Sequence, residues 1–346
     1  MKMEHNFTSR ISTPFDLSKS EVETWEKLTS KFAGNFSPFL SLHYIKAVAE
    51  AGVDVRVCVI LLNDTTQGFF PYQFKNRYYS WSKSAEPVGA EMTDYFGIIA
   101  APGFSITPEQ LLKLAKINHF GFSHLDESQL TYGLIAEQPR IGLRIRLNMG
   151  AEHPLDELCL SKHKYLKDTE RRARQLVTDL GKVEFNFDVQ NNMQRYLEHL
   201  IIQKRAQYHR TDARDALSDK WKQKLLSKLS EYQFKNCRGI LSTLYAGDQW
   251  VASHFGIMGN GVLQYWLPVY NPECSKYAPG RLLIHHIIQS CQSASIHTID
   301  RGEGDTPSKR ELTNEEHLFY RGVWHNKTIS SLAIQTFNSL KWRLGS

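Results

Sequence analysis

The sequence predicts an α/β protein of the mixed α+β type, built from two similar halves. Short apolar runs alternate along the chain with longer amphipathic segments, which is the order expected when helices cover a sheet. The 346 residues also exceed the roughly 100–200 residues of one typical domain. We therefore expect an N-terminal half over residues 1–150 and a C-terminal half over residues 151–346, joined at the small, polar stretch MGAEHP.

The first half is expected to hold three helices and three strands. A polar, helix-forming segment spans residues 20–31, and an amphipathic helix over 39–51 ends at Gly52, a residue suited to a helix C-terminus. Two apolar strands, 53–62 and 69–74, flank the polar turn 63–68. A third helix is expected over 109–117 and a short strand over 122–125.

The second half begins with a strongly helical stretch over residues 156–180, which Gly181 closes. Further helices are expected over 193–209, 220–232 and 282–291. Strands are expected over 183–189, 240–245, 250–258, 262–269 and 296–299. The middle three of these are separated by turns that contain glycine, which predicts two consecutive hairpins.

The two halves echo each other weakly. Each has a strand, a polar turn with glycine, a second strand, a later helix with a Leu-Leu pair, and a strand that ends in Asp. The corresponding residues are Leu61, Gly68, Leu111-Leu112 and Asp126 in the first half, and Leu244, Gly247, Leu282-Leu283 and Asp300 in the second. This pattern suggests an old duplication, far weaker than a solenoid repeat.

Composition excludes several classes of protein. A hydrophobic fraction of 41% with 12% aromatic residues excludes a disordered chain, and a net charge of +6 is too small for a general DNA-binding protein. The five cysteines are widely spaced and form no C-x-x-C pair, so neither a disulfide framework nor a metal site is expected. The first 20 residues lack an apolar core, and the longest apolar run, 57–62, is far shorter than the ~20 residues of a membrane span. We expect a cytoplasmic protein without a transmembrane segment.

One candidate binding site is the helix start at Gly280. A glycine there lets a ligand approach the backbone closely, while free N–H groups and the helix dipole attract an anion. A phosphate or pyrophosphate held over residues 280–282, with Arg281 adding charge, is one interpretation. A plain helix start at Pro279-Gly280 is the other, because a single glycine is a weaker signal than G-x-G-x-x-G.

A second candidate is the acidic loop Asp300-Arg301-Gly302-Glu303-Gly304-Asp305, followed by Lys309. Ligands of open sheets usually bind beyond the carboxyl ends of the strands, and a carboxylate there could accept a proton from an attacking amine or hydroxyl. The alternative is an Asp-Gly turn whose carboxylates bind backbone amides.

A third candidate is the basic segment between residues 162 and 174, where Lys167 and Arg171 share a helix face that could hold a phosphate. The alternative is a solvated surface with local pairs to Asp168 and Glu170. His254, in a predicted strand, is either a proton acceptor or a histidine of the core.

These marks together resemble the GNAT-superfamily acetyltransferases of the cellulose-biosynthesis (CelD-like) group, which are related to the FemAB-type peptidyltransferases. The resemblance rests on the order of short motifs: YAG with VA, the strand LQYWL, YNPE, YAPGRLL and the segment from Asp300 to Lys309. The last motif is similar to the family's D-aromatic-G-R-G-D-x-x-Y-K, from which Arg301, Glu303 and Ser308 depart.

The resemblance implies tandem GNAT-like halves, each a twisted mixed sheet flanked by helices, with one acyl-donor site in the second half. It implies transfer of an acetyl or other acyl group from acyl-CoA, without a metal, to an amine or hydroxyl of a sugar nucleotide or polysaccharide precursor. Association with a polysaccharide-synthesis complex is also implied.

The residues expected to act fall into three sets. Those for proton transfer are Asp300, Asp305, His254 and Glu303. Those for coenzyme A are Tyr277, Gly280, Arg281, Leu282 and Leu267. Those for the substrate are Lys309, Tyr265, Arg171 and Lys167. Two alternatives stay open: a FemAB-like enzyme that uses aminoacyl-tRNA, with the basic helix on the RNA, and an inactive structural relative in a synthesis complex.

Overall fold

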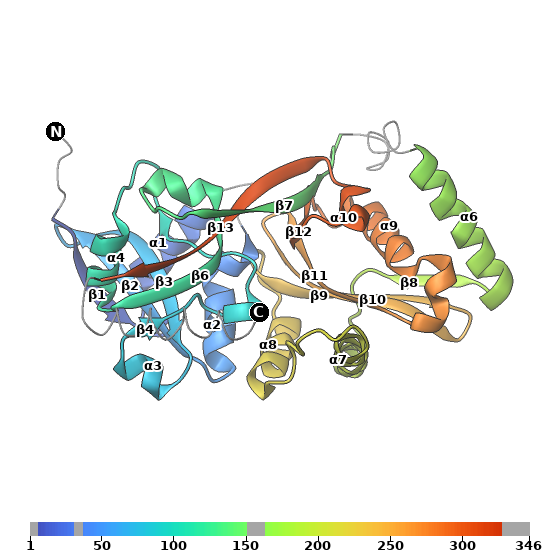
Figure 1. Ribbon diagram of the computed structural model, residues 1–346, viewed down its shortest axis with the longest axis horizontal. Coiled ribbons are helices and arrows are strands. Elements are labelled where there is room, and N and C mark those ends of the chain that lie inside the picture. The colour runs from blue at the N-terminus through green and yellow to red at the C-terminus, as the bar shows by residue number, and fades with distance from the viewer. Residues whose placement is uncertain (1–5, 31–36, 151–162, 327–346) are drawn as a thin grey trace. The chain divides into compact units, whose positions relative to one another are not determined.

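The computed structural model describes residues 6–30, 37–150 and 163–326 (Figure 1). The chain divides into two compact units. Unit 1 comprises Met1–Lys31, Val48–Arg140 and Leu318–Ser346, and unit 2 comprises Phe32–Ala47 and Ile141–His317. Unit 2 thus takes residues 32–47 and 141–150 from the expected N-terminal half, and unit 1 takes residues 318–346 from the expected C-terminal half. The division into halves at residue 150 stays a prediction.

Unit 1 is built on two sets of strands. A four-stranded sheet has the order β1-β2-β3-β5, with strands Thr8–Ser12, Asp54–Leu62, Thr65–Phe74 and Ile99–Ala100. Strand β6 (His119–Asp126) pairs with β4 (Ser84–Ala85) and with β13 (Glu315–His325). Helices α1 (Lys19–Ser30) and α4 (Pro108–Ala115) pack on the four-stranded sheet, and α3 (Arg77–Trp81) follows β3.

Aromatic side chains fill the core of unit 1. The Trp25 ring lies 4.8 Å from that of Phe69, and the Phe120 ring lies 5.2 Å from that of Phe70. All four side chains are fully buried. Aromatic pairs at this spacing add to the free energy of burial, so the apolar strands predicted over 53–74 form the centre of this unit.

Unit 2 contains the sheet that positions the candidate site. Its strands run in the order β7-β12-β11-β10-β9-β8. Their bounds are Gln138–Arg146, Thr298–Glu303, Val262–Tyr270, Gln249–Gly259, Arg238–Ala246 and Val183–Asn186. Neighbouring strands are antiparallel except β11 and β12, which are parallel.

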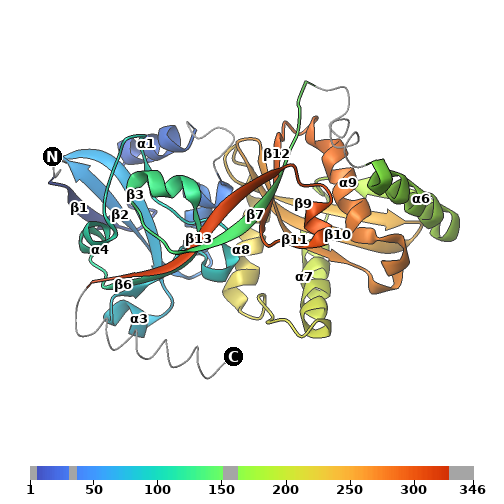
Figure 2. The ribbon, with the colours of Figure 1, turned by 45° about the horizontal axis from the view of Figure 1, so that its top comes forward.

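Helices cover both faces of this sheet (Figures 1 and 2). Helices α6 (His163–Leu180) and α9 (Pro279–Cys291) lie on one face, and α7 (Met193–Arg210) and α8 (Lys220–Glu231) on the other. Leu283 and Ile287 of α9 pack in one core cluster with Leu244 and Leu263 of the sheet. Burial of side chains of this kind gives about 1.5–3 kcal/mol each, so α9 is firmly seated.

The strands β11 and β12 separate in the middle of the sheet. They pair only over Val262–Gln264 and Thr298–Asp300, and β11 then continues to Tyr270. Just after this paired stretch, β11 has a bulge. Phe255 of β10 pairs with Leu267 and Ile257 pairs with Gln264, so β11 contains one residue more than β10 between these two pairs. A bulge bends a strand and redirects its side chains, so the residues after Gln264 leave the parallel register.

The structure also differs from the predicted elements in places. The helix expected over 39–51 is a 3₁₀ turn (Pro38–Leu40) followed by α2 (Leu42–Glu50), because Ser41 is extended between them. Helix α9 begins three residues earlier than expected, since proline is well suited to the first helical position. The part of the expected helix over 156–162 lies outside the described residues. None of the described helices has the length and apolarity needed to cross a membrane.

Candidate active site

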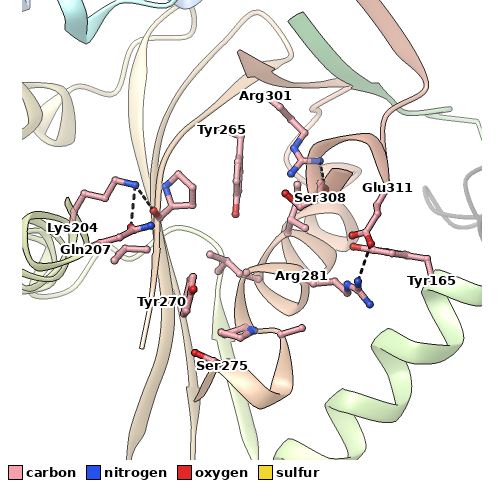
Figure 3. A pocket seen from close by; sticks show the side chains of 17 residues that line it. Tyr165, Lys204, Gln207, Tyr265, Tyr270, Ser275, Arg281, Arg301, Ser308 and Glu311 are labelled. Atoms are coloured by element: carbon pink, nitrogen blue, oxygen red, sulfur yellow. Dashed lines mark hydrogen bonds and ion pairs between the residues drawn. The ribbon is translucent and has the colours of Figure 1, made fainter. Parts of the chain in front are cut away.

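A cavity of about 480 Å³ opens in unit 2 where β11 and β12 separate (Figure 3). Its walls come from β11, β12, the start of α9, helices α6 and α7, and the segment around α10 (Pro307–Arg310). The lining side chains that carry polar groups are Tyr165, Lys204, Gln207, Tyr265, Tyr270, Ser275, Arg281, Arg301, Ser308 and Glu311. Ligand cavities in proteins are commonly about 300–1,000 Å³, so this one can hold a cofactor-sized group.

The first turn of α9 forms part of the cavity wall. Ala278 adopts a left-handed conformation (φ 54°), Pro279 begins the helix, and Gly280 lies in its first turn. A Cβ placed on Gly280 would meet nothing within 4 Å, so the backbone here borders open space. Pro279 has no N–H, and the N–H groups of Arg281 and Leu282 donate to the carbonyl of Ala278, at 2.9 and 3.2 Å. The N–H of Gly280 is therefore the group that this turn offers to an anion in the cavity.

Arg281 belongs to the same wall, but its charge is already paired. Its guanidinium donates to the carboxylates of Asp168, at 2.7 Å, and of Glu311, at 3.0 Å, and lies 4.4 Å from the centre of the Tyr165 ring. Asp168 also accepts from Arg171 and Arg172, and these hydrogen bonds hold the pKa of Asp168 well below its usual range. Arg281 therefore ties three segments together.

Tyr265 forms the wall at the bulge. Its ring stacks on the imidazole of His254, with centres 4.4 Å apart, and burial raises the pKa of its phenol. His254 is fully buried, and burial lowers the pKa of its imidazole to about 3. The imidazole is therefore neutral at physiological pH and packs behind the cavity wall rather than in it.

Lys204 lines the cavity but is not among the residues expected to act; in the sequence it belongs to a second basic cluster with Arg205. Its ammonium donates to the carbonyl of Pro268, at 2.8 Å, and to Gln207, at 3.3 Å, and burial lowers its pKa to about 8. A signal was present in the sequence: Lys204 lies on the buried face of α7, in helical register with Leu197 and Leu200. A lysine on an apolar face is rarely buried without a partner, which marks such a position for attention.

Because Lys204 is buried, the free energy of unfolding should depend on pH. Its pKa in the folded protein is about 8, below the unfolded value of roughly 10.4, so between these values the unfolded chain binds more protons. The penalty for the buried charge is therefore full below pH 8 and falls as the pH rises. We expect Lys204→Met to remove this slope: its stability relative to wild type should fall by about 2 kcal/mol between pH 8 and 9.5, measured by urea unfolding.

The four residues predicted for proton transfer lie outside the cavity lining. Asp300 is 1% exposed; its carboxylate accepts from Arg144, at 2.9 Å, and from the N–H of Gly302. Asp305 is exposed and pairs with Arg310, which lowers its pKa. Glu303 is half-buried at the end of β12, and its backbone carbonyl accepts from Lys309.

Some of the remaining predicted residues line the cavity, and the others lie elsewhere. Gly280, Arg281 and Tyr265 line the cavity. Lys309 holds the carbonyls of Arg301 and Glu303, each at 2.7 Å, and Tyr277 donates to Asp179 at 2.6 Å. Buried positions are taken by Leu282 and Leu267, and exposed positions on α6 by Lys167 and Arg171.

A metal site would need several His, Cys, Asp or Glu side chains close together among residues 6–30, 37–150 and 163–326. Within these ranges, no three His, Cys, Asp or Glu side chains gather closely enough to hold an ion. Cys58, Cys237, Cys274 and Cys291 are buried and free, and burial raises the pKa of each thiol.

Comparison with known proteins bears on this unit. Residues 163–310, which carry most of the cavity wall, match the family described as "Acetyltransferase (GNAT) domain". No curated protein matches the chain significantly in sequence.

Several solved structures share the fold over nearly the whole chain. The C-terminal domain of a putative lysylphosphatidylglycerol synthetase from Agrobacterium fabrum matches with a TM-score of 0.52 and 12% identity, covering 93% of this chain and 98% of that one. A tandem GNAT protein from the clavulanic acid biosynthesis pathway matches with a TM-score of 0.51 and 9% identity, covering 93% and 100%. FemX matches with a TM-score of 0.54 and 10% identity, covering 89% and 96%.

The predicted fold class, mixed sheets flanked by helices in the arrangement of tandem GNAT proteins, is confirmed by these matches. At such low identity the structural matches speak for the fold alone. Residues 163–310 are thus similar to GNAT-type acetyltransferase domains, and they supply all of the cavity lining except Glu311.

Proposed function

We propose that the cavity binds an acyl-CoA thioester and that the protein transfers the acyl group to an amine or hydroxyl. The observation that carries this proposal is the place where β11 and β12 part, next to the first turn of α9. The N–H of Gly280 and the positive end of the helix dipole would receive the pyrophosphate. The thioester would then extend along β11 toward Tyr265.

The proposed reaction is a direct transfer between two bound substrates. The nitrogen or oxygen of the acceptor attacks the thioester carbonyl carbon, a C–N or C–O bond forms, and the C–S bond breaks. The thiolate of coenzyme A leaves and takes up one proton, while the acceptor loses one. Holding both reactants in one cavity supplies much of the rate, and backbone N–H groups of β11 would stabilise the charge on the carbonyl oxygen.

The acceptor we propose is a sugar nucleotide or polysaccharide precursor, on the resemblance to the CelD-like group. Assignment of the acceptor's proton to Asp300, Asp305, His254 or Glu303 remains part of this proposal, and so does association with a polysaccharide-synthesis complex. The FemAB-like alternative places α6 on RNA. Two basic residues of this helix, Arg171 and Arg172, are already paired with Asp168.

Calorimetric titration with acetyl-CoA, longer acyl-CoAs and free pyrophosphate tests the proposal. We expect saturable binding of a thioester that is much tighter than that of pyrophosphate, because the apolar lining residues Val269, Leu283 and Ile284 contribute as well as the helix start. A preference among chain lengths would identify the acyl group. Absence of thioester binding, together with salt-sensitive binding of aminoacyl-tRNA, would favour the FemAB-like alternative instead.

A further inference from the structure

The cavity carries more positive than negative charge. Three cationic side chains line it, Lys204, Arg281 and Arg301, against one acidic side chain, Glu311. Glu311 is paired with Arg281, and its charge acts on Arg301 only at longer range. Neither Lys204 nor Arg301 forms an ion pair with a carboxylate in the part of the chain that the structure describes. Charged groups inside proteins are ordinarily paired, so two unpaired cations in one cavity indicate an anionic ligand.

Arg301 is the more informative of the two cations. Its Nη1 donates to the backbone carbonyls of Ser308 and Lys309, at 3.2 and 2.7 Å, which fixes the guanidinium in place. Its Nε is buried and has no partner, and burial lowers the pKa of the side chain. A guanidinium held on one edge, with N–H groups to spare, is suited to a carboxylate.

Arg301 lies at the end of the cavity away from the start of α9. Figure 3 shows Arg301 and Tyr265 at one end of the cavity and Ser275 at the other. The carbonyl of Ser275 accepts from the N–H of Ala278 at 3.1 Å, so the first turn of α9 lies at the end of Ser275. A phosphate at the helix start would therefore leave Arg301 without an anion.

We propose that Arg301 binds a carboxylate on the reacting part of the substrates, carried either by the transferred acyl group or by the acceptor next to its nucleophile. This rests on the acyl transfer proposed above and adds a chemical class to it. An anion in the cavity would also stabilise the protonated form of Lys204.

Two pairs of matched compounds separate the two sources of the carboxylate. Succinyl-CoA and butyryl-CoA have acyl chains of equal length and differ in the terminal carboxylate; their dissociation constants are measured by calorimetry. For the acceptor, β-alanine and propylamine differ in the same way, and acetylated product is quantified by mass spectrometry with acetyl-CoA as donor. One pair should show a preference of about tenfold or more for the carboxylate, as a charge-assisted hydrogen bond implies.

Variants then assign the preference to Arg301. Arg301→Gln should abolish it, Arg301→Lys should retain part of it, and Arg195→Gln should leave it unchanged, since Arg195 is exposed on α7 outside the cavity. Thermal unfolding of each variant monitors the loss of the Nη1 bonds, and a preference lost from Arg301→Gln but kept in part by Arg301→Lys excludes mere unfolding.

The outcomes distinguish the two proposals. If thioesters bind but neither pair shows a preference that depends on Arg301, the carboxylate inference is wrong and acyl transfer stands. If no thioester binds at all, the proposed function fails and the carboxylate inference fails with it.

Discussion

Replacing Asp300 with Asn is expected to destabilise the protein by about 3 kcal/mol. Asp300 and Arg144 form an ion pair in which the side chains are 1% and 8% exposed, and removal of one partner from such a pair leaves a buried charge without compensation. Glu315, 3.2 Å from Arg144, remains in the variant and keeps the cost at the lower end of the usual 3–5 kcal/mol. Chemical denaturation at pH 7 measures the difference.

Asp305 supplies the matched control for this variant. Its carboxylate is exposed and pairs with Arg310 at the surface. The free energy of unfolding of Asp305→Asn should therefore be close to that of wild type. Both residues are candidates for proton transfer. A catalytic role for Asp300 would produce the opposite pattern, in which Asp300→Asn keeps its stability and loses turnover.

A large side chain at Gly280 is expected to weaken acyl-CoA binding about tenfold or more. The Cβ position borders open space in the cavity, so Leu at this position would occupy the volume proposed for the pyrophosphate and cost its hydrogen bonds to the backbone. Stability should be unchanged or slightly raised, because Gly280 lies in a helix and its φ is not positive. Calorimetry and thermal unfolding measure the two effects.

Gly280→Ala completes this experiment as a size series. Its single methyl group meets nothing within 4 Å, so Ala should raise stability as Leu does and weaken binding much less. Equal affinities of wild type, Ala and Leu variants would show that the donor does not use the first turn of α9.

Much of the fold could be predicted from the sequence. Each part that was missed can be traced to particular residues. The consecutive strands β9, β10 and β11 follow from apolar runs separated by glycine turns, which are local signals. Strand β7 was missed although Ile141, Leu143 and Ile145 alternate with other residues in the period of a strand that has one apolar face. Its other face carries Arg144 and Arg146. Both side chains belong to an ion-pair network with Asp300 and Glu315, which lie more than 150 positions away in the sequence.

Only part of the candidate site could be predicted, because the cavity is lined by segments that lie far apart in the sequence. Gly280, Arg281 and Tyr265 belong to local motifs and line the cavity, whereas Tyr165, Lys204 and Glu311 come from other segments. Asp300 was singled out because an acidic loop at a strand end is a common place for chemistry. The sequence carries no local sign that Arg144, from another strand, neutralises it.

The pairing of Arg281 with Asp168 and Glu311 has a consequence for how the cavity opens. The three residues join α9, α6 and the segment after α10 through charges that are only partly shielded from water, at side-chain exposures of 21%, 32% and 37%. Added salt weakens such contacts, with a screening length near 8 Å at physiological ionic strength. We therefore expect amide hydrogen exchange in α6 to quicken with ionic strength while α9, seated in the core, exchanges at a constant slow rate. The rim of the cavity would then loosen while its floor stays rigid.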